Sequence, residues 1–207
     1  MIKLEKGGRI NLSKTENGSK VDHVFFGINW GMIEKKGIFG MGASKEAVDL
    51  DASVLIYDDN KNLIDKVYFG HLTSNDGAIR HSGDDLTGDA DGDDGLDNEI
   101  IKVQFNLLNP KVTNLVFILN SYRHHKFDDI PFASARIYTN DSGKPTDVKE
   151  IMAKYNIANG PEFNGKEAVI LGVSYKKDGE WRFKAVGLTS NSQSIADIAR
   201  NDVPQIL

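Results

Sequence analysis

The chain has 207 residues, with 40% hydrophobic residues, 25 basic and 30 acidic residues and no cysteine, which is typical of a soluble globular protein with one sizeable core. The net charge of −5 and basic runs no longer than pairs such as Lys176-Lys177 argue against nucleic-acid binding, and the lack of cysteine excludes disulfides and thiolate metal sites. Because no N-terminal apolar signal and no membrane-length apolar run is present, we expect one cytoplasmic domain over residues 1–207 without a transmembrane segment.

The first half of the chain predicts short strands separated by turns. Apolar and β-branched runs favour strands at 10–13, 21–30, 51–57, 63–69 and 78–81. The turn-rich residues 58–62 predict that the third and fourth of these form an antiparallel hairpin. The glycine-rich residues 37–43 indicate a loop, and residues 44–48 could form one helical turn.

The second half continues this pattern and ends in a helix. Strands are predicted at 99–105, 114–120, 132–138, 167–175 and 180–187, and Asp178-Gly179 favours a type I′ turn between the last two. Residues 151–157 fit either a strand or a helix, and we choose a strand. Residues 192–200 predict a short helix with Ser192 or Ser194 as its N-cap. The predicted fold is an all-β, antiparallel two-sheet β-sandwich with a short C-terminal helix.

The stretch from Ser82 to Glu99 contains an unusual concentration of negative charge. Two carboxylates 5 Å apart repel by about 1 kcal/mol in water and about 3 kcal/mol at an effective dielectric of 20, so a compact loop needs compensating positive charge. Without these acids, the chain has 25 basic and 22 acidic residues, so the acidity is local. Interleaved glycines allow tight turns, and crowded oxygen ligands suit calcium. The eight acids of the stretch are Asp84, Asp85, Asp89, Asp91, Asp93, Asp94, Asp97 and Glu99.

The spacing of these acids does not match two common calcium motifs. An EF-hand loop that starts at Asp89 has Asp94 at position 6 and Ile100 at position 12, and one that starts at Asp91 has Lys102 at position 12. The glycine and aspartate pattern of β-roll nonapeptides occurs only once. With these two motifs excluded, the interpretation that remains is a calcium site formed by loops at one end of the β-sandwich.

Several motifs resemble the TerD family of tellurium-resistance and stress-response proteins. In chain order they are Asp49-Leu-Asp51-Ala-Ser53, Ser74-Asn-Asp76-Gly77, His81 to Gly88, Asp91-Gly-Asp93-Asp94 and Gly179 to Gly187, and the match runs over about residues 2–200. The resemblance implies a β-sandwich whose Asp-rich loops bind calcium. The metal ligands that it implies here are Asp49, Asp51, Asp76, Asp84, Asp91, Asp93, Asp94 and Glu99.

The chain departs from the family pattern at three places. Asp85 replaces the usual asparagine, and Ala90 replaces the usual glycine before the last acidic triplet. Residues 95–98 separate Glu99 from Asp94, where the family has a glutamate directly after the two aspartates. Asp97 therefore competes with Glu99 as the ligand.

We expect a non-enzymatic protein that binds about two calcium ions and presents the ordered loops to protein partners. By analogy with the family, these partners are other stress-response or tellurium-resistance proteins, including a membrane complex at the cytoplasmic face. The alternatives are a metal-dependent hydrolase of phosphorylated or glycosidic substrates, and a calcium-bridged lectin or membrane-surface module. His81 is expected to form a hydrogen bond with a loop carboxylate, and His124-His125 to lie in a surface turn.

Overall fold

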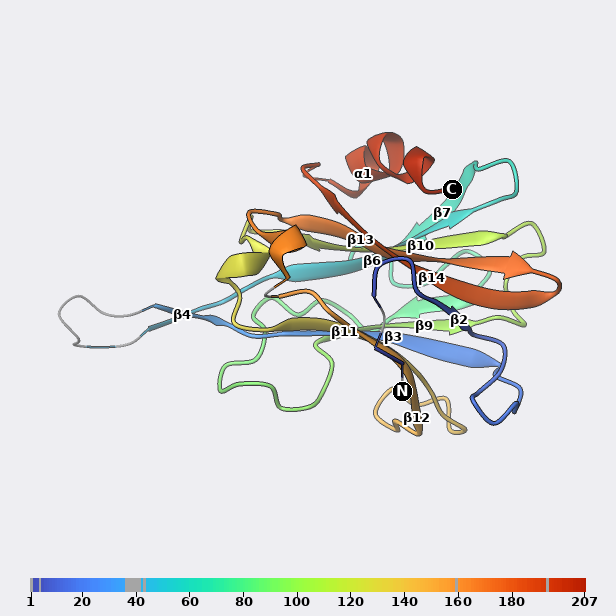
Figure 1. Ribbon diagram of the computed structural model, residues 1–207, viewed down its shortest axis with the longest axis horizontal. Helices are drawn as coiled ribbons and strands as arrows, with labels where there is room; N and C mark the ends of the chain where they lie inside the picture. The colour runs from blue at the N-terminus through green and yellow to red at the C-terminus, as the bar shows by residue number, and fades with distance from the viewer. Residues whose placement is uncertain (1, 4, 36–41, 43, 159, 193) are drawn as a thin grey trace.

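The computed structural model describes residues 2, 3, 5–35, 42, 44–158, 160–192 and 194–207. Its strands form two six-stranded sheets that pack face to face (Figure 1). In spatial order, the first sheet contains β1 (Ile2–Lys3), β12 (Glu150–Asn156), β11 (Ala133–Thr139), β3 (His23–Trp30), β9 (Glu99–Gln104) and β8 (Ile79–His81). The second contains β2 (Arg9–Asn11), β14 (Glu180–Ser190), β13 (Ala168–Lys177), β10 (Asn114–Ser121), β6 (Leu50–Tyr57) and β7 (Leu63–Val67).

The pairing confirms the predicted antiparallel sandwich. All neighbouring strands within the two sheets are antiparallel except β1 and β12, which pair in parallel. The hairpin of β6 and β7 is confirmed, as is the one of β13 and β14, where Asp178 and Gly179 both have the positive φ that a type I′ turn requires. The ambiguous residues 151–157 form a strand, so the helical alternative is wrong.

Two elements near the acidic end differ from the sequence-based expectation. Ser44–Glu46 is not a helical turn but strand β5, which pairs with β4 (Ile33–Lys35) in a separate two-stranded ribbon. This ribbon projects away from the sandwich on the left of Figure 1. Residues 37–41 and 43 of the predicted loop lie outside the described residues.

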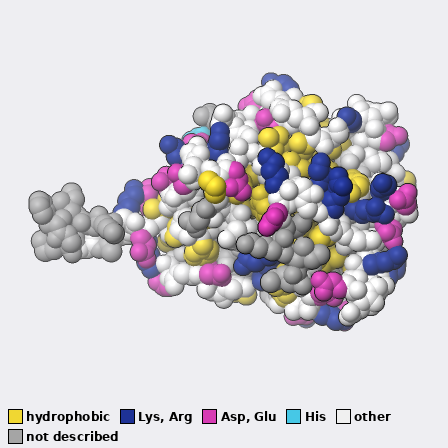
Figure 2. Space-filling view, viewed as in Figure 1, with side chains coloured by type: hydrophobic (Ala, Val, Ile, Leu, Met, Phe, Trp, Pro, Cys, Tyr) yellow, Lys and Arg dark blue, Asp and Glu magenta, His cyan; other side chains and the backbone are white. Residues whose placement is uncertain are grey.

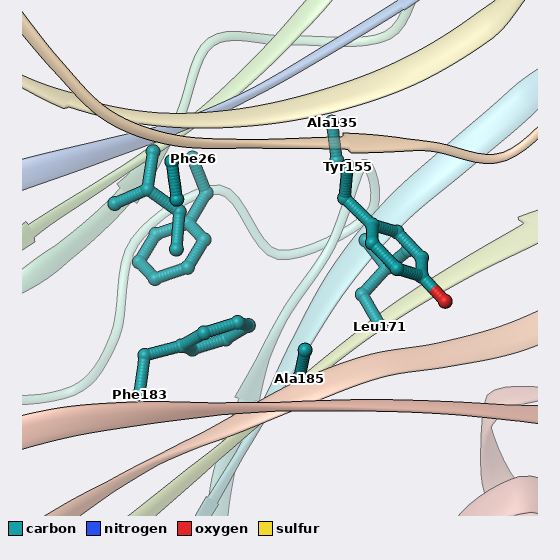
Figure 3. A pocket seen from close by; sticks show the side chains of 8 residues that line it. Phe26, Ala135, Tyr155, Leu171, Phe183 and Ala185 are labelled. Carbon is teal, nitrogen blue, oxygen red and sulfur yellow. The ribbon is translucent and has the colours of Figure 1, made fainter. Parts of the chain in front are cut away.

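The main core lies between the sheets, because inward side chains alternate along most strands. The rings of Phe26 from the first sheet and Phe117 from the second stack with centroids 3.6 Å apart. A small apolar cavity of about 20 Å³ remains beside them, lined by Phe26, Ala135, Ile137, Ala153, Tyr155, Leu171, Phe183 and Ala185 (Figure 3). Apart from the Tyr155 hydroxyl, the side chains that line the cavity are apolar, whereas a buried water needs several polar partners.

A second apolar layer covers the outer face of β6, β10 and β13. Helix α1 (Ile195–Asn201) and the 3₁₀ turn η4 (Val203–Gln205) place Ile198 and Val203 there against Val116 and Ile170. This explains why the run 114–120 is apolar on both faces. Ser194 is the N-cap of α1, and two further 3₁₀ turns are η2 (Phe127–Asp129) and η3 (Pro161–Phe163).

No helix in the described part of the chain is long and apolar enough to cross a membrane.

Candidate metal centre

The acidic stretch forms the connection between the adjacent strands β8 and β9. It lies at the end of the sandwich from which the β4–β5 ribbon projects, and the ion pair between Lys45 of β5 and Asp91 joins the two. The backbone of Asp89 also pairs with Trp30 and Met32, which connect β3 to the ribbon. The loop is therefore held against the sandwich by backbone hydrogen bonds.

A first group of acids combines Asp49, Asp51 and Asp84. One carboxylate oxygen of each lies within 4.8 Å of the others. Asp49 and Asp51 flank Leu50 at the beginning of β6, and both are only 2% exposed, whereas Asp84 comes from the acidic loop and is exposed. The group therefore has a buried side and a side open to solvent.

The first group contains more negative charge than its surroundings neutralise. Burial, together with the charges of Glu99, Asp49 and Asp84, raises the pKa of Asp51 from 3.8 to about 7. Burial and the charge of Asp84 also raise the pKa of Asp49. Arg123 compensates only in part, because its Nε lies 3.5 Å from Asp49 Oδ2 and its side chain is 47% exposed. A cation at this position would favour the ionised form of all three acids.

Unpaired oxygen atoms beside the first group fit a bound cation. Asp49 Oδ1 and Asn120 Oδ1 are buried and have no hydrogen-bond partner among the described residues. The amide of Asn120 donates to Asp51 Oδ2 at 3.2 Å, so its oxygen lies next to the acids. A buried acceptor without a donor costs about 1–3 kcal/mol, and oxygen-rich coordination by calcium would remove that cost. This donor set fits a hard divalent cation.

The structure brings Glu99, and not Asp97, to the first group. Glu99 is fully buried because it shares the inward face of β9 with Ile101. Its Oε2 accepts a hydrogen bond from Ala52 N at 2.7 Å, next to Asp51. Asp97 instead forms an ion pair with Arg136, at 2.8 Å, on the other side of the loop.

His81 stabilises the buried Glu99. Gly83 N donates to His81 Nδ1 at 3.1 Å, so the ring proton is on Nε2. This Nε2 lies 3.1 Å from the carbonyl oxygen of Ala52 and 3.3 Å from Glu99 Oε2. His81 thus lies beside a carboxylate as expected, but the hydrogen bond of its Nε2 goes to the Ala52 carbonyl oxygen.

A second group of acids combines Asp89, Asp93 and Asp94, again with oxygens within 4.8 Å of one another. Asp93 and Asp94 are exposed and Asp89 is half-buried. Asn98 connects this group to the first loop segment, because its amide donates to Asp89 Oδ1 at 3.0 Å and to Asp85 Oδ2 at 3.2 Å. Asp89 of the second group is therefore linked through Asn98 to Asp85, the chain neighbour of Asp84 of the first group.

Three expected ligands lie outside both groups: Glu99, which lies beside the first group, Asp91 and Asp76. Asp91 is exposed and paired with Lys45 at 2.5 Å. Asp76 accepts hydrogen bonds from Ser74 Oγ, Ala78 N and Asn109 N, beyond the opposite end of β8 and β9. These hydrogen bonds indicate that Asp76 orders a turn.

Sequence reasoning did not identify three residues that shape the site. Asp89 was one of the eight loop acids, but nothing distinguished it as a ligand. Asp85 organises the loop: although burial opposes ionisation, hydrogen bonds from Gly88, Thr87 and Asn98 lower its pKa. Asn120 lies near the end of the apolar strand β10, and only its pairing opposite Asp51 connects it with the acids.

Comparisons with known proteins identify the family of the chain. A family model described as "TerD domain" matches residues 1–201. The tellurium resistance protein TerZ of Serratia marcescens is 31% identical over 208 residues, covering 100% of both chains. The stress response protein SCP2 of Bacillus subtilis (strain 168) is 34% identical over 209 residues, covering 95% of this chain and 96% of its own.

The crystal structure of a homologue of the telluride resistance protein TerD, SCO6318 from Streptomyces coelicolor A3(2), has the same fold. It superposes with a TM-score of 0.63 over 86% of this chain and 95% of its own, at 16% identity. The match of the family model to nearly the whole chain and the two relatives above 30% identity show that the chain belongs to the TerD family.

Proposed function

We propose that this protein is a non-enzymatic calcium-binding protein of the tellurium-resistance and stress-response type. The observation that carries the proposal is the first acidic group, where buried Asp49 and Asp51 and exposed Asp84 converge beside unpaired buried oxygens. Names of relatives that refer to resistance and stress, rather than to a reaction, support a non-enzymatic role.

Two ions would be bound with different strengths. Asp49, Asp51 and Asp84, with the oxygen of Asn120, would hold the first, and Asp89, Asp93 and Asp94 the second. The first site is the tighter one, because it is more buried and because Asp49 Oδ1 and Asn120 Oδ1 have no other partner among the described residues. Calcium suits such crowded carboxylates better than magnesium, which retains its water molecules.

The bound ions would fix the shape of this end of the sandwich. Neutralising the first group removes the repulsion between strand β6 and the loop, and neutralising the second orders the exposed loop tip. Cytoplasmic stress-response or tellurium-resistance proteins would then dock on the ordered loops. The names of the relatives, which refer to tellurium resistance and stress response, support this choice of partners.

The test is a thermal melt in chelator and after addition of calcium or magnesium at equal concentration. A ligand at about 100 times its Kd stabilises the folded state by about 2.7 kcal/mol, which raises Tm by roughly 5–10 °C for a protein of this size. Asp84→Asn is expected to reduce the shift strongly, because Asp84 is exposed and its replacement does not disturb the core.

Asp59→Asn is the matched control. It makes the same change of charge in the exposed turn between β6 and β7, at the other end of β6 from Asp51. Calorimetric titration gives the stoichiometry, with two ions expected for the wild type and one for Asp93→Asn/Asp94→Asn. A protein whose Tm responds to neither ion would contradict the proposal.

A further inference from the structure

Pairing of β2 with β14 assembles a basic surface from two distant parts of the chain. Segments 5–14 and 175–184 together contain seven cations and three acids, in a chain whose net charge is −5. Figure 2 shows Lys and Arg side chains gathered over the right-hand part of the view, where Figure 1 places β14. We call the outer surface of these strands the basic face; its cations are Arg9, Lys14, Lys177, Arg182 and Lys184.

The strand register places the central cations on one side of the sheet. Arg9 lies directly opposite Lys184, and Arg182 lies two residues before Lys184 on β14. The alternating residues Trp181 and Phe183 are buried in the core, so the cations point to the outer face.

These cations are mostly unpaired. Lys14 pairs with Glu180 at 2.6 Å, and Arg182 has only long contacts to Asp178 and Glu180, at 3.5 and 3.8 Å. No ion pair between described residues involves Arg9, Lys177 or Lys184. Like charges directly opposite each other destabilise a sheet. An anionic partner that lies over this face would remove that repulsion.

The basic face is also open. Helix α1 and η4 cover the apolar outer side of β6, β10 and β13, whereas Arg9, Arg182 and Lys184 lie beyond them on β2 and β14. Tyr175 lies opposite Arg182 and is half-buried, which adds an aromatic side chain to the cations. The outer side of β2 and β14 is therefore a broad, accessible surface whose side chains suit contact with a polar, negatively charged partner.

We propose that the basic face docks on the surface of a lipid bilayer that contains anionic phospholipids. A flat array of cations on two neighbouring strands matches a plane of headgroup phosphates. Anionic membranes attract Lys and Arg by about fivefold in affinity for each residue near the surface. The proposal is independent of metal binding, because the acidic loop contributes no residue to this face.

A second copy of the chain is a weaker candidate for the same face. Its acidic loop has the opposite charge, but the carboxylates there already have partners: Asp91 pairs with Lys45, and Asp93 accepts hydrogen bonds from Asn29 and Gly95. The loop also protrudes, which fits a flat surface poorly. Self-association is therefore an outcome that the test must distinguish.

The experiment measures co-sedimentation with phosphatidylcholine vesicles that contain or lack phosphatidylserine, in the presence of chelator. The wild type is compared with Arg9→Gln/Lys184→Gln and with the control Lys126→Gln/Lys154→Gln, whose exposed cations lie elsewhere. Both variants change the net charge equally, so a difference between them reports the position of the cations. Melting temperatures verify that both variants are folded.

We expect binding only to the phosphatidylserine vesicles, a decrease of about 25-fold in partitioning for Arg9→Gln/Lys184→Gln, and a change of less than about twofold for the control. Absence of binding at low ionic strength would overturn the proposal, as would equal losses in both variants. Salt-sensitive self-association without vesicle binding would assign the face to a second copy instead. None of these outcomes depends on the calcium-induced change in Tm, so the two proposals can fail separately.

Discussion

Asp51 is buried at the beginning of β6, where the nearest charges are the carboxylates of Asp49, Asp84 and Glu99. The crowded carboxylates have two effects with one origin. Their negative charge attracts calcium, and in the metal-free protein the same charge opposes the ionisation of Asp51 and destabilises the fold. The same substitution should therefore have opposite effects in the two states of the protein.

Asp51→Asn is expected to raise the Tm in chelator and to abolish the calcium-induced increase. The neutral amide removes the repulsion with Glu99, but it is a weaker ligand for a cation. Thermal melts of both proteins with and without calcium measure the two effects. A variant that is destabilised in chelator would show that Asp51 is not strained by its neighbours.

The raised pKa of Asp51 predicts a pH dependence for the metal-free protein. The folded protein keeps a proton on Asp51 up to about pH 7, whereas the unfolded chain releases it near its ordinary pKa of 3.8. Raising the pH from about 4 to about 7 therefore lowers the free energy of unfolding, and this contribution is constant above that range. Urea denaturation in chelator at several pH values measures the slope, which should be smaller in Asp51→Asn.

Gly27 allows the Asp97–Arg136 pair to form. A Cβ on Gly27 would lie 2.0 Å from Asp97 Oδ2, so Gly27→Ala must displace a carboxylate that is almost completely buried. We expect a loss of about 3 kcal/mol, the magnitude typical of a broken buried ion pair. Urea denaturation measures it, and in an Asp97→Ala background the loss should be much smaller.

Among the elements, helix α1 depends most on a single side chain. It has only seven residues, and Ser194 accepts a hydrogen bond from Asp197 N at its beginning. Ser194→Ala should lower the free energy of unfolding by about 1 kcal/mol, whereas Thr146→Ala, at an exposed loop position, should change it by less than about 0.5 kcal/mol. Equal effects in urea denaturation would mean that α1 does not contribute to the measured stability.

At the scale of the whole molecule, one apolar core connects the two sheets, which predicts a single cooperative unfolding transition. Trp30 lies on β3 of the first sheet and Trp181 on β14 of the second, and both are buried. In Trp30→Phe the remaining Trp181 reports on the second sheet, and in Trp181→Phe the remaining Trp30 reports on the first sheet, so fluorescence melts of the two variants follow the sheets separately. After correction for the stability of each variant, the two transitions should coincide with the loss of β-structure, and separate transitions would indicate two folding units.

The sequence by itself determined most strands, the two hairpins, the C-terminal helix and the position of the acidic loop, because these features depend on local periodicity and turn residues. It did not predict β1 or β4, and it suggested a helical turn for β5, since these three polar residues have no periodicity and only pairing with β4 makes them a strand. The motifs also sufficed for the family, which the comparisons confirm.

Only the tertiary structure decided which charges meet. Asp51 and Asn120 become neighbours through the register of β6 and β10, and the alternation of β9 turns Glu99 into the core. The pairing of β2 with β14 gathers the basic face from both ends of the chain. Strand order and register depend on contacts between residues far apart in the sequence, and local patterns do not contain that information.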